Sequence, residues 1–391
     1  MDPVSSVLQP LTVPTGAAVA SVLPTLDDAL AGRGDALLPL PAGDAREIAR
    51  LTDALKPGEP IDEGVALVVA TSGSTGIPKG AMLSAAALRA SGDATHDRLG
   101  GPGSWLLALP AHHIAGLQVL LRGLLAGTEP VVVDVSAGFD PAALPAAVAA
   151  LRGPRRYTSL VPTQLIKALD HPDATAALAD LDAVLLGGAA TPGPVLARAR
   201  AAGITVVRTY GMSETCGGCV YDGAALDGVR VRLEESRVLL GGPVLASGYR
   251  GLPDHPAFAE PGWFRTDDAG LVEDGVLRIL GRLDEAISTG GLTVVPQVVE
   301  AALVTHPEVA EVAVFALPDD RLGQRVTAAV VPIAGTAPTL DSLREHASRS
   351  LDPTAAPREL HLLDALPLRG PGKIDRRALA ARFAHSPVPA E

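Results

Sequence analysis

An apolar, β-branched run that ends directly in a loop of small polar residues constrains the fold more than any other feature of the chain. The run is VALVVA, residues 65–70, and the loop is TSGSTGIPKG, residues 71–80. The run predicts a buried strand. In the loop, glycines let backbone amides approach an anion, hydroxyl groups add hydrogen-bond donors and one lysine adds positive charge. We therefore expect this loop to hold a polyphosphate.

The loop differs from the GxxxxGK[ST] phosphate-binding pattern. Pro78 stands five residues after Gly73, where that pattern has a second glycine. A surface turn rich in small residues is the alternative interpretation. The predicted phosphate-binding residues are Thr71, Ser72, Gly73, Ser74, Thr75, Gly76 and Lys79.

Strand and helix patterns alternate on both sides of this loop. Helices are expected at 44–55, 84–98, 141–151 and 194–202, and further strands at 106–110, 131–134, 157–162, 183–188 and 204–211. Alternation of elements with these lengths predicts a layered α/β domain.

From residue 229 the pattern changes to paired strands, and after residue 282 to a shorter alternation of helices (296–306, 341–351) and strands (310–316, 326–331, 359–363). A chain of 391 residues also exceeds the roughly 250–300 at which one core stops growing. The predicted fold is α/β, with a large N-terminal layered domain, 1–283, that includes a β-rich portion. A small C-terminal α+β domain, 284–391, is predicted to follow on a hinge.

Composition excludes several classes of partner. The net charge is -12, so the chain lacks the basic excess that nucleic-acid binding needs. No apolar run approaches a membrane span, and the first thirty residues lack the pattern of a secretory signal. With only Cys216 and Cys219, a reducing compartment and hence the cytoplasm is expected. A homodimer is left open.

Five motifs, in order, resemble the signature of the adenylate-forming superfamily, which comprises acyl-CoA synthetases, nonribosomal peptide adenylation domains and firefly luciferase. They are TSGSTGIPKG at 71–80, TYGMSET at 209–215, GWFRTDD at 262–268, GRLDEAISTGG at 281–291 and GKIDRRAL at 372–379. The resemblance implies a two-domain enzyme that activates a carboxylic acid with ATP. It also implies Mg2+ as cofactor and coenzyme A as co-substrate.

The resemblance assigns roles within the ATP site. It implies that Tyr210 stacks on adenine, that Glu214 and Thr75 help to hold Mg2+, and that Asp268, helped by Arg282, binds the ribose. Asp267 stands where the family usually has glycine, so either neighbouring carboxylate could take the ribose. The remaining implied ATP contacts are Gly188, Ala189, Gly211 and Ser213.

Lys373 is implied to be the catalytic lysine of the mobile domain, acting with Lys79, Glu214 and His113. A cation between the attacking carboxylate and the phosphate would offset the repulsion between two anions. A solvated lysine in a basic turn is the alternative. Asp284 falls at the family's hinge, although a linker residue paired with Arg282 is the simpler interpretation. The predicted lining of the coenzyme A approach is Ser288, Thr289, Gly290 and Gly291.

The substrate side resembles the family at LPAHHIAG, residues 109–116, which places His113 at a gating position. No aspartate lies in this motif to bind an amine, which disfavours an amino-acid substrate. Gln118 and Arg122 are spaced to share roughly one helical face with His113, and Arg122 could meet a second substrate carboxylate. An arginine paired with a protein acid or reaching solvent is the alternative. Predicted substrate contacts are His113, Gln118, Arg122, Gly187, Thr209, Met212 and Thr215.

The segments LPAHHIAGLQVLLRGLLAG and TYGMSETCGGCVYDG, together with only about 70 residues before the phosphate loop, look like the actinobacterial o-succinylbenzoate–CoA ligases of menaquinone synthesis. That likeness implies conversion of o-succinylbenzoate, ATP and CoA to o-succinylbenzoyl-CoA, AMP and pyrophosphate. The alternatives are another acyl- or aryl-CoA synthetase, an adenylating module acting on a carrier protein, and a nucleotide-binding regulatory module. The CxxC spacing of Cys216 and Cys219 suggests a redox or metal site, but small residues lining the acyl pocket are preferred.

Overall fold

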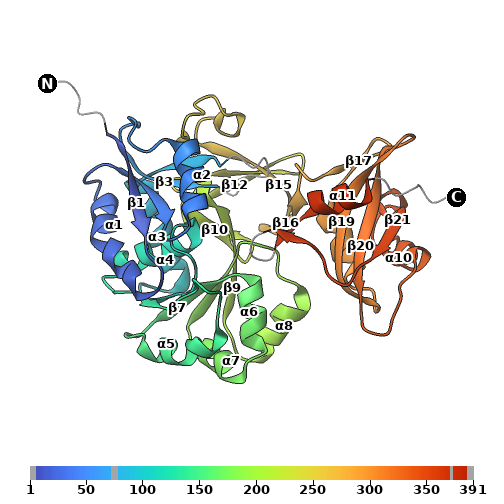
Figure 1. Cartoon of the computed structure of the whole chain (residues 1–391), viewed down its shortest axis with the longest axis horizontal. Helices are drawn as coiled ribbons and strands as arrows, with labels where there is room; N and C mark the ends of the chain where they lie inside the picture. Colours follow the sequence, from blue (N-terminus) through green and yellow to red (C-terminus); the bar gives the residue numbers. More distant parts are fainter. Residues whose placement is uncertain (1–5, 72–77, 370–372, 385–391) are drawn as a thin grey trace. The chain divides into compact units, whose positions relative to one another are not determined.

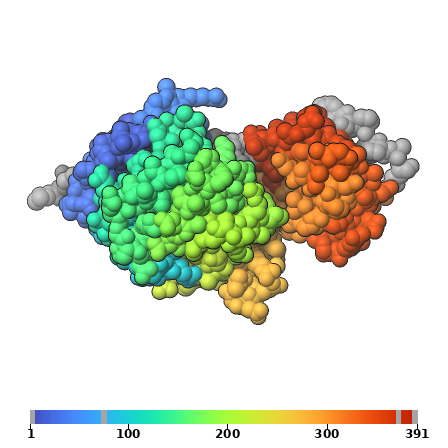
Figure 2. All heavy atoms as spheres, turned by 90° about the horizontal axis from the view of Figure 1, so that it is seen from below, coloured from blue at the N-terminus to red at the C-terminus, as the bar shows by residue number. Residues whose placement is uncertain are grey.

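The computed structural model describes residues 6–71, 78–369 and 373–384, except the side chains of Arg369 and Lys373. The chain divides into two compact units. The large unit comprises Met1–Arg232 and Leu239–Arg265, and the small unit comprises Leu233–Val238 and Thr266–Glu391. Blue, green and yellow segments, far apart in the sequence, pack into the body of the large unit (Figure 2).

The expected boundary at 283/284 lies inside the small unit. Strands β15 (Trp263–Glu273) and β16 (Val276–Arg282) form an antiparallel hairpin with a register shift between Ala269 and Gly270. Its end is attached to helix α9 (Pro296–Leu303), because the Arg282 backbone N–H donates to Gln297 Oε1 at 3.2 Å. Through these contacts, residues 266–283 belong to the small unit together with the C-terminal part of the chain. A functional hinge at residue 284 stays a prediction.

The large unit is layered, with helices outside and between two sheets (Figure 1). Its first sheet has the order β1-β2-β3-β4-β14, in which β1, β2 and β3 are parallel and β4 is antiparallel to both neighbours. Helix α2 shares an apolar core with one face of this sheet. The bounds are β1 Leu8–Val13, β2 Ala36–Pro41, α2 Ala45–Leu55, β3 Val65–Ala70, β4 Gly80–Ser84 and β14 Gly248–Tyr249.

The second sheet has the order β11-β10-β9-β8-β7-β5-β6, and the five strands from β9 to β6 are parallel. Helices α5 to α8 and the strands share one core of buried leucine, valine and alanine. The strands are β5 Ser104–Leu107, β6 Val131–Val132, β7 Arg156–Leu160, β8 Ala183–Leu186, β9 Val206–Met212, β10 Gly217–Tyr221 and β11 Ala224–Ala225. The helices are α5 Leu144–Ala150, α6 Pro162–Leu169, α7 Pro172–Ala179 and α8 Gly193–Ala201.

Helices α1 Leu23–Leu30, α3 Ala85–Leu99 and α4 Ile114–Leu125 form the layer between the two sheets. Helix α4 contacts strands β5, β7 and β10 as well as the other two helices. Its residues from Gly116 to Gly123 are all buried, so α4 has no solvent-facing side along this stretch. Polar side chains on α4 therefore point into the interior of the unit.

A four-stranded sheet, β12-β13-β15-β16, includes residues of both units, and its strands β15 and β16 are antiparallel. The bounds are β12 Arg230–Glu234, β13 Arg237–Gly241, β15 Trp263–Glu273 and β16 Val276–Arg282. The C-terminal sheet has the order β18-β17-β20-β19, and β21 pairs with β20. Helices α9 and α10 share the core on one face, and α11 packs in a second cluster. The elements are β17 Ile287–Thr289, β18 Leu292–Val294, α9 Pro296–Leu303, β19 Val309–Asp319, β20 Gly323–Pro332, α10 Leu340–Ala347, β21 Glu359–Leu362, β22 Leu368–Arg369, β23 Lys373–Ile374 and α11 Arg376–Phe383.

Short 3-10 helices complete the description: η1 Gly16–Val22, η2 Pro141–Ala143, η3 Ser213–Thr215, η4 Pro256–Phe258 and η5 Pro353–Ala355. The predicted α/β class is confirmed. The expected helix 141–151 is two elements, because η2 precedes α5. Within the residues that the structure covers, every helix is too short or too polar to cross a bilayer.

Candidate active site

Two parallel strands of the second sheet bring predicted site residues to one edge. Gly187 follows the carboxyl end of β8, and Thr209 lies near the carboxyl end of β9. A Cβ atom on Gly187 would lie 2.4 Å from Thr209 Oγ1, so only glycine permits this approach. Gly188 and Ala189 follow Gly187 and are exposed. Ligands of open α/β sheets bind at this edge, which suits the predicted ATP and acid contacts.

The turn after β9 is stabilised by close packing of its backbone against β10 and by hydrogen bonds of side-chain hydroxyl groups. A Cβ atom on Gly211 would lie 2.0 Å from the Gly217 carbonyl oxygen of β10. In η3, Thr215 Oγ1 accepts from the Met212 N–H at 3.0 Å and donates to the Gly217 carbonyl at 2.7 Å. Ser213 Oγ donates to the Ala70 carbonyl at 3.3 Å. The TYGMSET segment is thereby joined to the end of β3, where the predicted phosphate loop begins.

The base of that loop is closed by the Thr71 N–H, which donates to the Lys79 carbonyl at 2.8 Å. Strands β3 and β4 pair on either side of it, with Ala70 opposite Gly80. Lys79 is therefore held at the start of β4. The predicted phosphate contacts Ser72, Gly73, Ser74, Thr75 and Gly76 lie outside the described residues.

Glu214 and Lys79 are both in contact with one aromatic residue, Tyr249 of β14. Glu214 is 6% exposed, and its Oε1 accepts a hydrogen bond from the Tyr249 hydroxyl at 2.5 Å. Lys79 Nζ lies 4.9 Å from the centre of the Tyr249 ring and 3.3 Å from Nε2 of His255. Buried Tyr249 thus stands between a predicted metal-binding carboxylate and a predicted phosphate-binding cation.

The substrate-side residues do not share one face of α4. His113 is the exposed N-cap residue of this helix, whereas Gln118 and Arg122 are 1% and 3% exposed. Gln118 Nε2 donates to the Cys216 carbonyl at 2.6 Å, while its Oε1 has no hydrogen-bond partner in the described structure. The buried pair is thus separate from His113.

Arg122 is a buried cation that pairs with no carboxylate among the residues that the structure describes. Its guanidinium carbon lies 5.2 Å from the centre of the Trp105 ring, and one terminal nitrogen donates to the Tyr221 hydroxyl at 3.4 Å. Its Nε is buried and has no hydrogen-bond partner in the part of the chain that is described. Burial lowers the pKa of Arg122, which the nearby Tyr221 partly opposes. The two simpler interpretations were an acid partner and contact with solvent. Arg122 is 3% exposed and makes no ion pair within the described part of the chain, so neither accounts for this side chain there.

Cys216 and Cys219 are free, fully buried thiols. Burial raises the pKa of both, so neither is a ready thiolate. No cluster of three metal-ligating side chains occurs among the described residues. The backbone of Cys216 has positive φ, 52°, and ends the turn after Glu214.

In the small unit, Asp268 and Arg282 are opposite each other in β15 and β16. Arg282 donates to Asp284 with two nitrogens, at 2.9 and 2.8 Å, and to Asp268 Oδ1 at 3.4 Å. Burial alone would lower the pKa of Arg282, but the hydrogen bond to Asp284 and the charges of the three aspartates raise it. Asp268 is buried, whereas Asp267 is exposed and pairs with Arg237 at 3.2 Å. The pairing of Arg282 with Asp284 matches the simpler interpretation of Asp284.

The predicted coenzyme A segment is a turn between β17 and β18. Ser288 and Thr289 end β17, and Gly290 and Gly291 form the turn with φ of 57° and 83°. The backbone of Lys373 pairs with Arg369 in a two-stranded hairpin. Its side chain lies outside the described structure.

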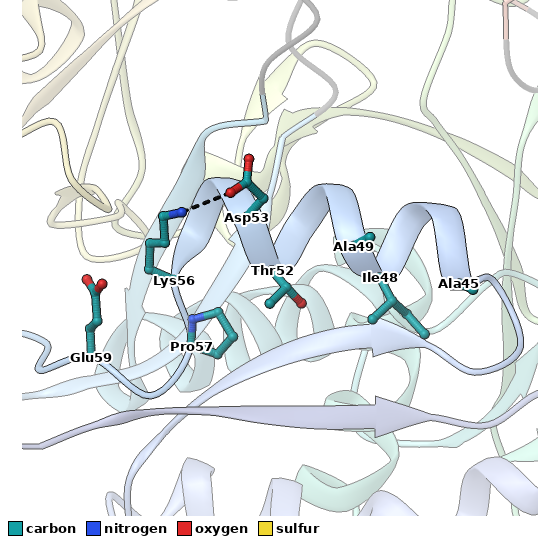
Figure 3. Close-up of a pocket in the computed structure, with 8 residues that line it drawn as sticks. All are labelled: Ala45, Ile48, Ala49, Thr52, Asp53, Lys56, Pro57 and Glu59. Carbon is teal, nitrogen blue, oxygen red and sulfur yellow. Dashed lines mark hydrogen bonds and ion pairs between the residues drawn. The ribbon is translucent and has the colours of Figure 1, made fainter.

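A surface hollow on α2 is not part of this site (Figure 3). None of its lining residues is a predicted site residue, and its charged pair, Lys56 and Asp53 at 2.9 Å, has side chains 54% and 87% exposed. We assign it no role in the chemistry. It is lined by Ala45, Ile48, Ala49, Thr52, Asp53, Lys56, Pro57 and Glu59.

The profile of the AMP-binding enzyme family matches residues 17–247, and that of the AMP-binding enzyme C-terminal domain matches residues 298–373. The chain belongs to the AMP-binding enzyme family. This confirms the predicted superfamily and the AMP-forming acid–CoA ligase class.

Three curated relatives have names of CoA ligases or synthases. A Mycobacterium tuberculosis (strain CDC 1551 / Oshkosh) protein named probable 2-succinylbenzoate–CoA ligase is 61% identical over 382 residues, which cover 96% of this chain and 99% of that protein. The 2-succinylbenzoate–CoA ligase of Salmonella typhimurium is 33% identical over 325 residues, 79% of this chain and 67% of that protein. A feruloyl-CoA synthase from an Amycolatopsis species is 32% identical over 406 residues, 92% and 82% of the two chains.

Solved structures share the fold over nearly the whole chain. The Escherichia coli enzyme MenE with a bound analogue has a TM-score of 0.76 at 25% identity and covers 98% of this chain and 89% of its own. ATP-bound MatB from Rhodopseudomonas palustris has a TM-score of 0.82 at 23% identity, with 97% and 89% covered. The predicted arrangement of a large N-terminal and a small C-terminal domain is the architecture of these enzymes.

Tyr249 and His255, which contact Lys79, lie outside the five motifs. Both lie between the motifs at 209–215 and 262–268, in a segment with no repeating pattern. The only local signal is that His255 precedes Pro256, as a residue that begins a helical turn often does. Their proximity to Lys79 depends on the pairing of β14 with β4, which links residues about 170 positions apart.

Proposed function

We propose that this chain is an ATP-dependent ligase that activates 2-succinylbenzoate and transfers it to coenzyme A, in menaquinone biosynthesis. The ligase class follows from the family, and the 61% identity over nearly the full length of both chains supports the choice of acid. Buried Arg122 is the single structural observation that carries this choice. A buried cation with no carboxylate partner in the described structure suits a substrate that retains a second carboxylate after the first is activated.

In the first step, an oxygen of the succinyl carboxylate attacks the α-phosphorus of ATP. The bond to the bridging oxygen breaks and pyrophosphate leaves. Lys79 is the cation at the phosphate side of the site, and Lys373 is proposed to approach from the mobile domain between carboxylate and phosphate. Tyr210 is proposed to stack on adenine, and Asp268 with Arg282 to hold the ribose.

Mg2+ is part of the proposal, and the residues present fit it. Glu214 supplies a buried hard oxygen donor, and the described structure lacks the multi-carboxylate cage that an all-protein site would need. A magnesium ion usually retains water and phosphate ligands, so one or two protein oxygens suffice. When bound, it would neutralise charge on the phosphates. The Tyr249 hydroxyl donates a hydrogen bond to Glu214 and so orients the carboxylate that would bind Mg2+.

In the second step, the thiolate of coenzyme A attacks the acyl carbon, the bond to the AMP oxygen breaks, and the thioester forms. The small domain is proposed to rotate about Asp284, so that the 288–291 turn takes the place of Lys373 at the active site. No side chain needs to act as a covalent nucleophile, because positioning and electrostatics supply the rate. The proposed compartment is the cytoplasm, in keeping with two free thiols. The homodimer stays a prediction.

The test is a thioester assay with purified protein, ATP, Mg2+ and CoA against 2-succinylbenzoate, benzoate, succinate, ferulate and octanoate. The expected result is a CoA thioester mass and pyrophosphate release with 2-succinylbenzoate, with kcat/KM at least about 100-fold above the other acids, the scale of one desolvated charge pair. Comparable turnover of ferulate or octanoate would contradict the proposed substrate while leaving the ligase class intact.

A further inference from the structure

His255 begins the 3-10 helix η4 and faces Lys79 with its far nitrogen. Its Nδ1 accepts a hydrogen bond from the Ala257 N–H at 3.2 Å, so the neutral ring carries its proton on Nε2. Nε2 lies 3.3 Å from Nζ of Lys79. The backbone hydrogen bond therefore fixes which ring nitrogen is the donor.

An ammonium group has only donors, so Lys79 cannot accept a hydrogen bond from the Nε2–H of His255. Two donor groups that lie 3.3 Å apart can both donate to one shared acceptor. An oxygen of a phosphate, with its negative charge and several lone pairs, accepts from both at once. The contact thus has the donor arrangement of an oxyanion site.

Tyr249 orients both donors. Lys79 Nζ lies over its ring, and the His255 ring packs edge-on against it, with centres 4.7 Å apart and planes at 81°. Tyr249 is 3% exposed and held by its hydroxyl on Glu214. Because the platform is buried and hydrogen-bonded, both donors lose little further freedom when an anion binds.

We propose that His255 is a second phosphate-binding residue, which donates from Nε2 to a β- or γ-phosphate oxygen of ATP that Lys79 also binds. This inference rests on the proposed function, which supplies ATP at Lys79. After the α-phosphorus bond breaks, the same two donors retain the leaving pyrophosphate. AMP has no β- or γ-phosphate oxygens, so His255 does not contribute to its binding affinity.

Two substitutions separate this role from the capping role of the same ring. In His255→Asn, the side-chain oxygen can still accept from the Ala257 N–H, because asparagine is a good N-cap, but the distant donor is lost. In His255→Gln, a longer amide can place a donor near the position of Nε2, while the cap is weakened. A phosphate-binding role therefore predicts that His255→Asn has the larger effect of the two substitutions. A capping role predicts that His255→Gln has the larger effect.

The experiment measures ATP, inorganic pyrophosphate and AMP binding to the full-length wild type and both variants by calorimetry, with urea unfolding of each. We expect His255→Asn to weaken ATP and pyrophosphate binding roughly 10- to 100-fold, the range for one hydrogen bond to a charged group, with AMP binding and stability retained. His255→Gln should weaken pyrophosphate binding less, by about threefold. Normal pyrophosphate binding by His255→Asn would overturn the inference and leave the proposed function standing. Absence of ATP binding by the wild type would overturn both.

Discussion

The hydroxyl of Tyr249 donates a hydrogen bond to Glu214 Oε1 at 2.5 Å, and the ring of the same tyrosine lies beneath the Lys79 ammonium. The tyrosine is buried, and it contacts the carboxylate through its hydroxyl and the amine through its ring. Tyr249 therefore links Glu214, a predicted metal-binding residue, to Lys79, a predicted phosphate-binding residue.

Tyr249→Phe keeps the ring under Lys79 but removes the hydrogen bond to Glu214. We expect the Mg2+ concentration for half-maximal pyrophosphate exchange to rise roughly tenfold, with a small change in ATP affinity, because a bond to a charged group is lost. Tyr249→Leu removes both contacts and should also weaken ATP binding. Equal Mg2+ requirements in the wild type and Tyr249→Phe would show that the hydroxyl does not position Glu214.

Arg122 can be tested against a matched substrate, 4-oxo-4-phenylbutanoate, which is 2-succinylbenzoate without the ring carboxylate. For Arg122→Leu, we expect kcat/KM for 2-succinylbenzoate to fall about 100-fold and that for the analogue to change little, because only the first makes the charge pair. Arg122→Lys should retain part of the preference. Equal losses with both substrates would assign Arg122 a purely structural role beside Trp105.

Lys373 is expected to act in adenylation and not in thioester formation. Lys373→Ala should lower pyrophosphate exchange by about 100- to 1,000-fold, while conversion of supplied acyl-adenylate and CoA to thioester is retained, because its charge is needed only when two anions meet. Arg377→Ala, which removes an exposed cation four residues away, is the matched control and should retain both half-reactions. Loss of both half-reactions in Lys373→Ala would contradict the assigned role.

Arg376 is predicted to stabilise the small unit in a pH-dependent manner. It donates to both Glu300 oxygens, at 2.7 and 2.8 Å, and to Glu285 at 2.9 Å. Burial raises the pKa of Glu300 despite the opposing charge of Arg376. A raised carboxyl pKa means that stability is present below the unfolded pKa and is lost as the pH rises through the folded value. Arg376 offsets part of that loss.

Arg376→Gln should therefore cost more unfolding free energy at pH 8 than at pH 5, on the order of 3–5 kcal/mol at the higher pH, where Glu300 is left buried and charged. Urea unfolding at both pH values measures the difference. Adding Glu300→Gln to this variant should remove the pH dependence. A loss that is the same at both pH values would mean that Glu300 does not titrate in this range.

Local sequence signals predicted much of the fold. The strand expected at 65–70 is β3, and Ser84 and Asp44 accept from backbone N–H groups at the starts of α3 and α2. Apolar β-branched runs and N-cap residues act within a few positions of themselves, so the sequence displays them directly.

Contacts between distant segments could not be predicted from local sequence signals. The expected shared face of His113, Gln118 and Arg122 assumed an amphipathic helix, but α4 is enclosed between two sheets and its polar residues face the interior. Tyr249 meets Glu214 across 35 positions through strand pairing that no periodicity encodes. The site formed by the sequence motifs stays a prediction, and the structure adds the contacts that Tyr249, a residue between motifs, makes with Glu214 and Lys79.

The most direct test follows an oxygen atom from 2-succinylbenzoate labelled with 18O in its succinyl carboxylate. Attack on the α-phosphorus makes one labelled oxygen the bridge of the adenylate, and thiolate attack on the acyl carbon leaves that oxygen with AMP. The predicted result, measured by mass spectrometry, is one 18O in AMP for each thioester formed and unlabelled pyrophosphate. Formation of ADP with 18O in orthophosphate would place the attack at the terminal phosphorus and contradict the adenylate mechanism.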